Sequence, residues 1–132
     1  LGRLQPVPPV PEPLRVNVKL DDGVCGGAPW LRRAYIGFTA VKGKADQGGI
    51  SNNKGGYTGT FKSAVVEFDG LNFKATIEAT VDTSNGPQKG NYTFYLTGRA
   101  VGEEIFGKVD TALEGKVVKK GTDFMGGIGA IR

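Results

Sequence analysis

The side chains that this chain could use for catalysis are mainly carboxylates, lysines and tyrosines, because its 132 residues include no histidine and one cysteine. The lack of histidine excludes the usual general base near neutral pH and the Ser-His and Cys-His nucleophiles. A carboxylate pair, as in glycoside hydrolysis, remains the main acid–base arrangement. The candidates are Glu67 with Asp69, Asp82, Glu103 with Glu104, and Asp110 with Glu114. Most lie at expected hairpin ends or on polar strand faces, where solvated carboxylates are typical, so we expect a protein that is not an enzyme.

Cys25 and two glycine-rich stretches offer no recognisable cofactor or metal site. The thiol could be a nucleophile only if Arg32 or Arg33 lowered its pKa; a small buried side chain and an interchain disulfide are the other interpretations. The stretches GVCGGAP and DQGGISNNKGG lack the Gly-Lys-Ser/Thr ending of phosphate loops, and their carboxylates are too few for calcium. A single cysteine also excludes an intrachain disulfide. We therefore expect no cofactor and no bound metal.

Aromatic side chains beside polar ones are better candidates for a binding surface. An aromatic face can stack on a sugar ring while neighbouring polar groups bind its hydroxyls. Tyr95 shares a strand face with Thr97 and Arg99, which predicts a mixed polar and aromatic surface. The candidate ligand-binding residues are Trp30, Tyr57, Tyr92, Tyr95 and Arg99.

Short strands must position all of these residues. Apolar and polar side chains alternate over residues 14–20, 31–41, 57–68, 73–81 and 92–101, and further strands are expected over 105–118 and 124–131. Asp-Gly and Asn-Gly turn signals separate several of them. No helical period of useful length occurs, so the sequence predicts an all-β domain. We expect a single antiparallel β-sandwich or closed β-barrel of about seven to eight strands.

Three local features refine this expectation. The inward face changes parity within residues 57–68, which predicts a β-bulge near Ser63 and Ala64. Residues 42–56 read as one long loop without regular structure. Glycines at positions 59, 98, 107 and 115 favour strong curvature, and Gly98 in particular indicates a bend or the close approach of another backbone.

Residues 1–13 form a different kind of segment, because they hold five of the seven prolines. Proline fixes φ and lacks an N–H, so the segment is expected to be an extended arm or linker before an all-β domain at residues 14–132. The arm could be a tether or could dock on a neighbouring subunit. The residues proposed for subunit contacts are Pro6, Pro8, Pro9, Pro11, Pro13, Val16 and Val18.

These features lead to three hypotheses about function. The first is a non-enzymatic structural or assembly subunit that forms a homo-oligomer through its arm, in a filament, a surface layer or a virion. The second is a carbohydrate-binding β module, and the third is a small barrel that holds an apolar ligand. The net charge of +4 is spread along the chain, so no nucleic-acid partner is expected, and no apolar run is long enough for a membrane span. High glycine and low cysteine favour an extracytoplasmic or virion-associated location.

Overall fold

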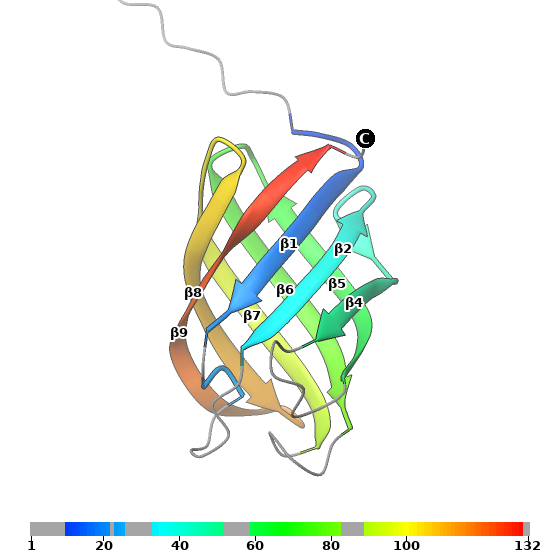
Figure 1. Ribbon diagram of the computed structural model, residues 1–132, viewed down its shortest axis with the longest axis vertical. Helices are drawn as coiled ribbons and strands as arrows, with labels where there is room; N and C mark the ends of the chain where they lie inside the picture. The colour runs from blue at the N-terminus through cyan, green and yellow to red at the C-terminus, as the bar shows by residue number, and fades with distance from the viewer. Residues whose placement is uncertain (1–9, 22, 26–32, 52–58, 83–88, 131–132) are drawn as a thin grey trace, which may run out of the picture.

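The domain is one antiparallel β-sheet that curls into a nearly closed barrel (Figure 1). The computed structural model describes residues 10–21, 23–25, 33–51, 59–82 and 89–130. The strands in these ranges are β1 (Leu14–Leu20), β2 (Ala34–Ala40), β3 (Lys44–Ala45), β4 (Gly48–Ser51), β5 (Gly59–Phe68), β6 (Asn72–Val81), β7 (Gly90–Val101), β8 (Glu104–Leu113) and β9 (Lys116–Ala130). Their order in the sheet is β3-β5-β6-β7-β8-β9-β1-β2-β4. The described ranges contain no helix with the length and hydropathy to cross a membrane.

The two end strands of the sheet, β3 and β4, both belong to the stretch of chain between β2 and β5. Val41 and Lys44 form a β-bridge around a two-residue turn, in which Lys42 has φ 52° and Gly43 has φ 77°. Positive φ at both central residues is the geometry that matches the twist of a hairpin. β4 then packs against β5 without being paired to it in the sheet order. The all-β prediction is therefore confirmed, and the barrel alternative describes the sheet better than the sandwich.

The strand count is nine in the described ranges, whereas the sequence predicted seven to eight. The difference arises mainly in residues 42–56, which were expected to form one irregular loop. β3 and β4 both lie in this stretch, and Ile50 of β4 is packed against the core. Their few apolar residues give too weak an alternation to be recognised, since the stretch is mostly glycine, lysine and polar residues. The prediction of an unstructured loop there was wrong for β3 and β4.

The interior of the barrel is filled by the apolar face of each strand. In β1 and β2, every second residue is buried, and the same alternation continues in β6 and β7. Aromatic rings occupy much of the centre: Tyr92 stacks on Phe94 with ring centroids 6.0 Å apart, and Phe73 lies 6.1 Å from Phe124. The β5–β6 register shifts between Phe61 and Ser63, so the predicted β-bulge is confirmed within two residues. A barrel of this strand number has room inside for side chains, and these side chains occupy it.

Candidate functional site

Two adjoining cavities lie at one end of the barrel. We call this end the mouth; its rim consists of the turns at residues 41–44, 69–72 and 101–104, with the start of β1 and the end of β9. The segment Val10–Pro13, which we call the strap, precedes β1 at this end (Figure 1). The mouth is therefore built from segments that are far apart in the sequence.

Backbone hydrogen bonds tie each rim turn to a neighbouring strand. The N–H of Val66 donates to the Gly43 carbonyl at 2.7 Å, and the N–H of Ala100 donates to the Leu71 carbonyl at 2.8 Å. The Ile128 N–H donates to the Glu103 carbonyl, also at 2.8 Å. Turns that are anchored in this way form a defined rim, because their backbone polar groups are satisfied by the barrel itself.

Asp69 fixes the shape of the turn between β5 and β6. Its Oδ1 accepts hydrogen bonds from the N–H groups of Asn72 at 2.7 Å and Leu71 at 2.9 Å, and its Oδ2 accepts from the Asn72 side chain. These donors, the Asn72 N–H foremost, favour the ionised carboxylate and lower its pKa to about 2. Asp69 is therefore an anion across the physiological range, and its role is to hold Leu71 and Asn72 in place at the mouth.

The strap bounds a first cavity of about 600 Å³. The N–H of Lys42 donates to Oε1 of Glu12 at 2.9 Å, which fastens the strap to the turn after β2. The floor of the cavity is apolar and consists of inward-facing residues near the strand ends, namely Leu14, Ala40, Val66, Phe68 and Phe73. Its charged lining residues are Glu12, Lys42, Glu67, Asp69 and Lys74. The cavity thus combines an apolar floor with a charged rim.

A second cavity of about 590 Å³ lies beside the first. Pro11 and Phe68 line both cavities, so the two share a wall. The second cavity is more apolar, with Leu71, Ala100, Val101 and Ile128 in its lining and Glu103 as its charged side chain. Leu71 and Val101 are 55% and 64% exposed, although both are large apolar residues. Apolar side chains exposed around a cavity are a feature of ligand sites.

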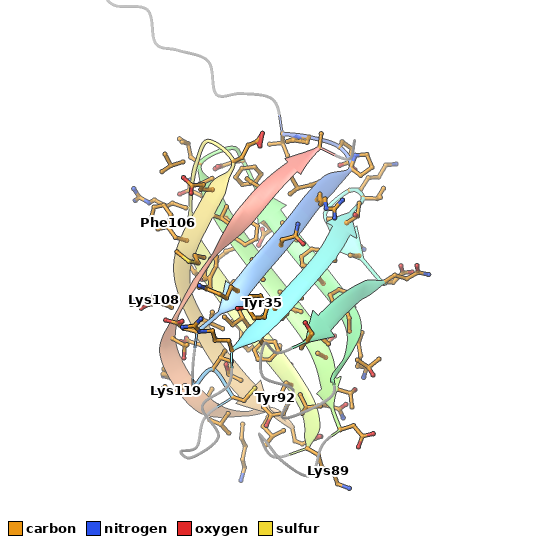
Figure 2. The ribbon with its side chains drawn as sticks, in the orientation of Figure 1. Tyr35, Lys89, Tyr92, Phe106, Lys108 and Lys119 are labelled. Carbon is orange, nitrogen blue, oxygen red and sulfur yellow. The ribbon has the colours of Figure 1, made fainter. Side chains whose placement is uncertain are left out.

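The aromatic residues proposed from the sequence do not form one site. Trp30 and Tyr57 lie outside the described residues. Tyr92 is 1% exposed and points into the barrel toward the end opposite the mouth (Figure 2), so it is not available to stack on a ligand at the surface. Tyr95 and Arg99 are exposed on the outer face of β7, as their shared parity predicted. Binding of a carbohydrate by these two residues stays a prediction.

The structure describes only part of the proposed assembly arm. Pro6, Pro8 and Pro9 lie outside the described residues, whereas Pro11 and Pro13 belong to the strap. Val16 and Val18 are buried, and β1 is paired on one edge with β2 and on the other with β9 of the same chain. In this single chain, Val16 and Val18 are therefore core residues and are not exposed for subunit contacts. Self-association through the residues before the strap stays a prediction.

The remaining reactive groups do not build a second site in the described ranges. Burial raises the pKa of the Cys25 thiol to about 12, and burial with a smaller contribution from Cys25 raises the pKa of Tyr92. The hydroxyls of Thr111 and Thr122 are buried and have no hydrogen-bond partner among the described residues. No group of three or more acidic or cysteine side chains comes together there as a metal site would require.

Sequence reasoning did not find the mouth. Phe68, Leu71 and Val101 each fit the alternation of their own strand or turn, and nothing local shows that they surround a common space. The exposed Leu71 beside Asp69-Gly70 was the available signal, since a large apolar residue in a hairpin turn is unusual. Comparison of the chain with protein-family models, with curated proteins and with solved structures found no match.

Proposed function

We propose that this chain is a non-enzymatic binding protein that takes a small, largely apolar molecule at the mouth of its barrel. The observation that supports this most is the pair of adjoining cavities, of about 600 and 590 Å³, beneath and beside the strap. Ligand pockets commonly measure about 300 to 1,000 Å³, are mostly apolar with a few polar groups, and occur in the mouths of β-barrels. Because the interior is filled by side chains, binding is assigned to the mouth and not to the barrel centre.

The charged groups of the mouth favour binding over catalysis. Hydrolysis by a carboxylate pair needs one carboxyl group that remains protonated near neutral pH. In the sequence-based pair that lines the first cavity, Glu67 and Asp69, the ionised member would be Asp69, and its oxygens are already occupied by three hydrogen bonds from its own turn. The proposal ranks above arm-mediated assembly because Val16 and Val18 are core residues and Pro11 lines cavities of its own barrel.

The proposal can be tested by filling each cavity separately. Ala40 lines the first cavity and Ala100 the second, and both are almost fully buried. We expect Ala40→Leu and Ala100→Leu each to weaken binding of the neutral fluorescent probe N-phenyl-1-naphthylamine, because the added side chain occupies the space that the probe would fill. Thr97→Leu places the same side chain on the exposed outer face of β7 and should leave binding unchanged.

Three outcomes decide the matter. Saturable binding to the wild-type protein that falls in both cavity variants, with thermal melts that show the variants to be folded, supports the proposal. Equal binding by the wild-type protein and both folded variants would place the probe elsewhere. The absence of any saturable binding by the wild-type protein would refute the proposed function. Light scattering on the same samples reports whether the chain associates with itself, which the arm hypothesis predicts.

A further inference from the structure

The outer face of the sheet carries two hollows away from the mouth. The larger, of about 660 Å³, lies over β9, β1, β2 and β4, and the smaller, of about 440 Å³, lies over β8, β9 and β1. Lys19 and Met125 line both, so the hollows form one depression, which we call the outer groove. It shares no lining residue with the two cavities of the mouth, so an inference about it does not depend on the ligand proposed there.

Strand register places the larger side chains of the outer groove in one row. Phe106 of β8 is opposite Met125 of β9, and Met125 is opposite Lys19 of β1. Lys19 is in turn opposite Tyr35 of β2, and Tyr35 and Phe106 mark the two ends of this row in Figure 2. Phe106 and Met125 are 48% and 54% exposed, although both are large and apolar. Since opposite residues on one face lie close enough to touch, the row is a continuous strip of aromatic and apolar surface with one lysine in it.

Beside this row, the groove has a floor with few side chains. The next outward positions are Gly127 on β9, Gly37 on β2 and Gly49 on β4, with Asn17 of β1 between the first two. A Cβ atom on Gly37 would lie 2.7 Å from Oδ1 of Asn17, so the Asn17 side chain lies over this glycine. A Cβ atom on Gly49 would meet nothing within 4 Å. The floor therefore leaves room for an extended chain to lie against the backbone.

The polar groups of the groove suit an uncharged occupant that is rich in hydrogen-bond acceptors. The larger hollow has no carboxylate in its lining, and its polar side chains can all donate: Asn17, Lys19, Tyr35 and Ser51. Among the described residues, none of these four side chains has a hydrogen bond or an ion pair. In the smaller hollow, Asp123 is paired with Lys108, and Asp21 with Arg33. The donors of the larger hollow are therefore the polar groups that the fold leaves unused.

The chain itself contains a segment with this chemistry. Residues 4–9, LQPVPP, carry no charge and include Pro6, Pro8 and Pro9. Because proline lacks an N–H, the segment offers more backbone acceptors than donors, and it favours the extended polyproline II conformation. Segments with Pro-x-x-Pro spacing, such as Pro6 to Pro9, are recognised in this conformation by grooves lined with aromatic side chains. We therefore propose that residues 4–9 of a second copy of this chain bind in the outer groove.

The dimensions of groove and segment agree, and they favour a second copy. The groove crosses four strand intervals from β8 to β4, about 19 Å, and six residues of polyproline II also span about 19 Å. Val10 lines the mouth with Leu14, whereas the larger hollow begins at Asn17, about 10 Å farther along β1. One residue spans at most about 3.6 Å, so Pro9 cannot reach the groove of its own barrel. The whole segment fits only in the groove of another copy.

The test measures self-association of the full chain by sedimentation velocity over a range of concentrations. We expect the wild-type chain to associate with itself. Tyr35→Ser with Met125→Ser removes much of the apolar row and should weaken association at least about fivefold, because loss of an anchor residue in an interface costs more than about 1 kcal/mol. Val65→Ser with Val117→Ser is the matched control, since both valines are about as exposed as Met125 and lie outside the groove.

A second variant changes the occupant and leaves the barrel intact. Pro6→Ala, Pro8→Ala and Pro9→Ala together remove the rings and restore N–H groups, so this triple variant should also associate at least about fivefold more weakly. These residues precede the strands, so the triple variant tests the inference even if thermal melts show the groove variant to be unfolded. A synthetic LQPVPP peptide should compete with the self-association of the wild-type chain.

The outcomes decide between the possible occupants. Association that is lost in the groove and proline variants and kept in the valine control supports the inference. A wild-type chain that stays monomeric at every concentration refutes it, even if the peptide binds, because the groove then takes a Pro-rich segment of another protein. Association that survives the triple proline variant, or that the valine control reduces equally, also refutes it.

Discussion

Gly98 on β7 allows a close approach of strands that shapes the barrel, and replacing it should destabilise the protein strongly. A Cβ atom at this position would lie 2.1 Å from the Phe106 carbonyl oxygen and 2.9 Å from Cζ of Phe124. Its register partner Gly107 is equally crowded, with the Thr97 carbonyl oxygen 2.2 Å from its added Cβ. The ring of Phe124 therefore packs across two glycines on neighbouring strands.

The expected size of the effect follows from these distances. Real Cβ atoms essentially never come within 3.0 Å of such neighbours, and the atom met first is a backbone oxygen of the adjacent strand, which cannot rotate away. Gly98→Ala must therefore move β8 and displace the Phe124 ring, which contacts Phe73 in the core. Overpacking of this kind costs about 1 to 3 kcal/mol, and we place Gly98→Ala at the upper end, about 3 kcal/mol, because two neighbours must move.

Gly49 on β4 provides a matched control. A Cβ atom there meets nothing within 4 Å, and its backbone φ is not in the left-handed region. Gly49→Ala should leave the free energy of unfolding unchanged or raise it by about 0.5 to 1 kcal/mol, because alanine has fewer conformations to lose in a strand. Urea denaturation followed by tyrosine and tryptophan fluorescence measures both variants. A Gly98→Ala protein within about 0.5 kcal/mol of the wild type would refute the reasoning.

Three further predictions concern buried or capped groups. Asp69→Ala should destabilise the protein at neutral pH, as urea denaturation would show. Because folding lowers the pKa of Asp69 from 3.8 to about 2, the difference in free energy of unfolding between wild type and variant should disappear as the pH falls from about 4 to below 2. Cys25, whose pKa is raised to about 12 by burial, should not react with iodoacetamide at pH 8 in the folded protein and should react after unfolding in guanidinium, as mass spectrometry would show; rapid labelling of the folded protein would contradict its burial. Thr111→Val removes a buried hydroxyl that has no partner among the described residues, so it should leave the melting temperature unchanged or raise it, and a clear decrease in calorimetry would show that the hydroxyl is satisfied.

Much of the fold could be predicted from alternation and turn chemistry. The inward faces of β1, β2, β6 and β7 follow directly from their apolar residues, and the parity change in β5 located its bulge. β3 and β4 could not be predicted, because Ala45 and Ile50 are too few to form a pattern within their glycine-rich stretch. Alternation of apolar and polar residues identifies a strand that has its own pattern. β3 and β4 have no such pattern, and they are strands because β3 pairs with β5 and β4 pairs with β2.

The candidate site was much less accessible to sequence reasoning. Tyr92 was proposed as a surface aromatic although its own alternation placed it with Phe94 on the inward face, where the structure has it. The mouth depends on Pro11, Phe68 and Val101, which come together only when the sheet closes. No short-range signal marks such a site, because each residue satisfies a local role and the cavity belongs to the nearly closed barrel as a whole.

The most direct test of the ligand site is an amide nitrogen–proton NMR titration of the labelled protein with decan-1-ol. We predict saturable shifts of the amides of Lys42, Leu71 and Val101, which surround the two cavities. The amide signals of Glu114 and Gly115, in the turn between β8 and β9 at the opposite end, should not shift. Shifts that are confined to that opposite end, or that never saturate anywhere in the protein, would contradict a ligand site at the mouth.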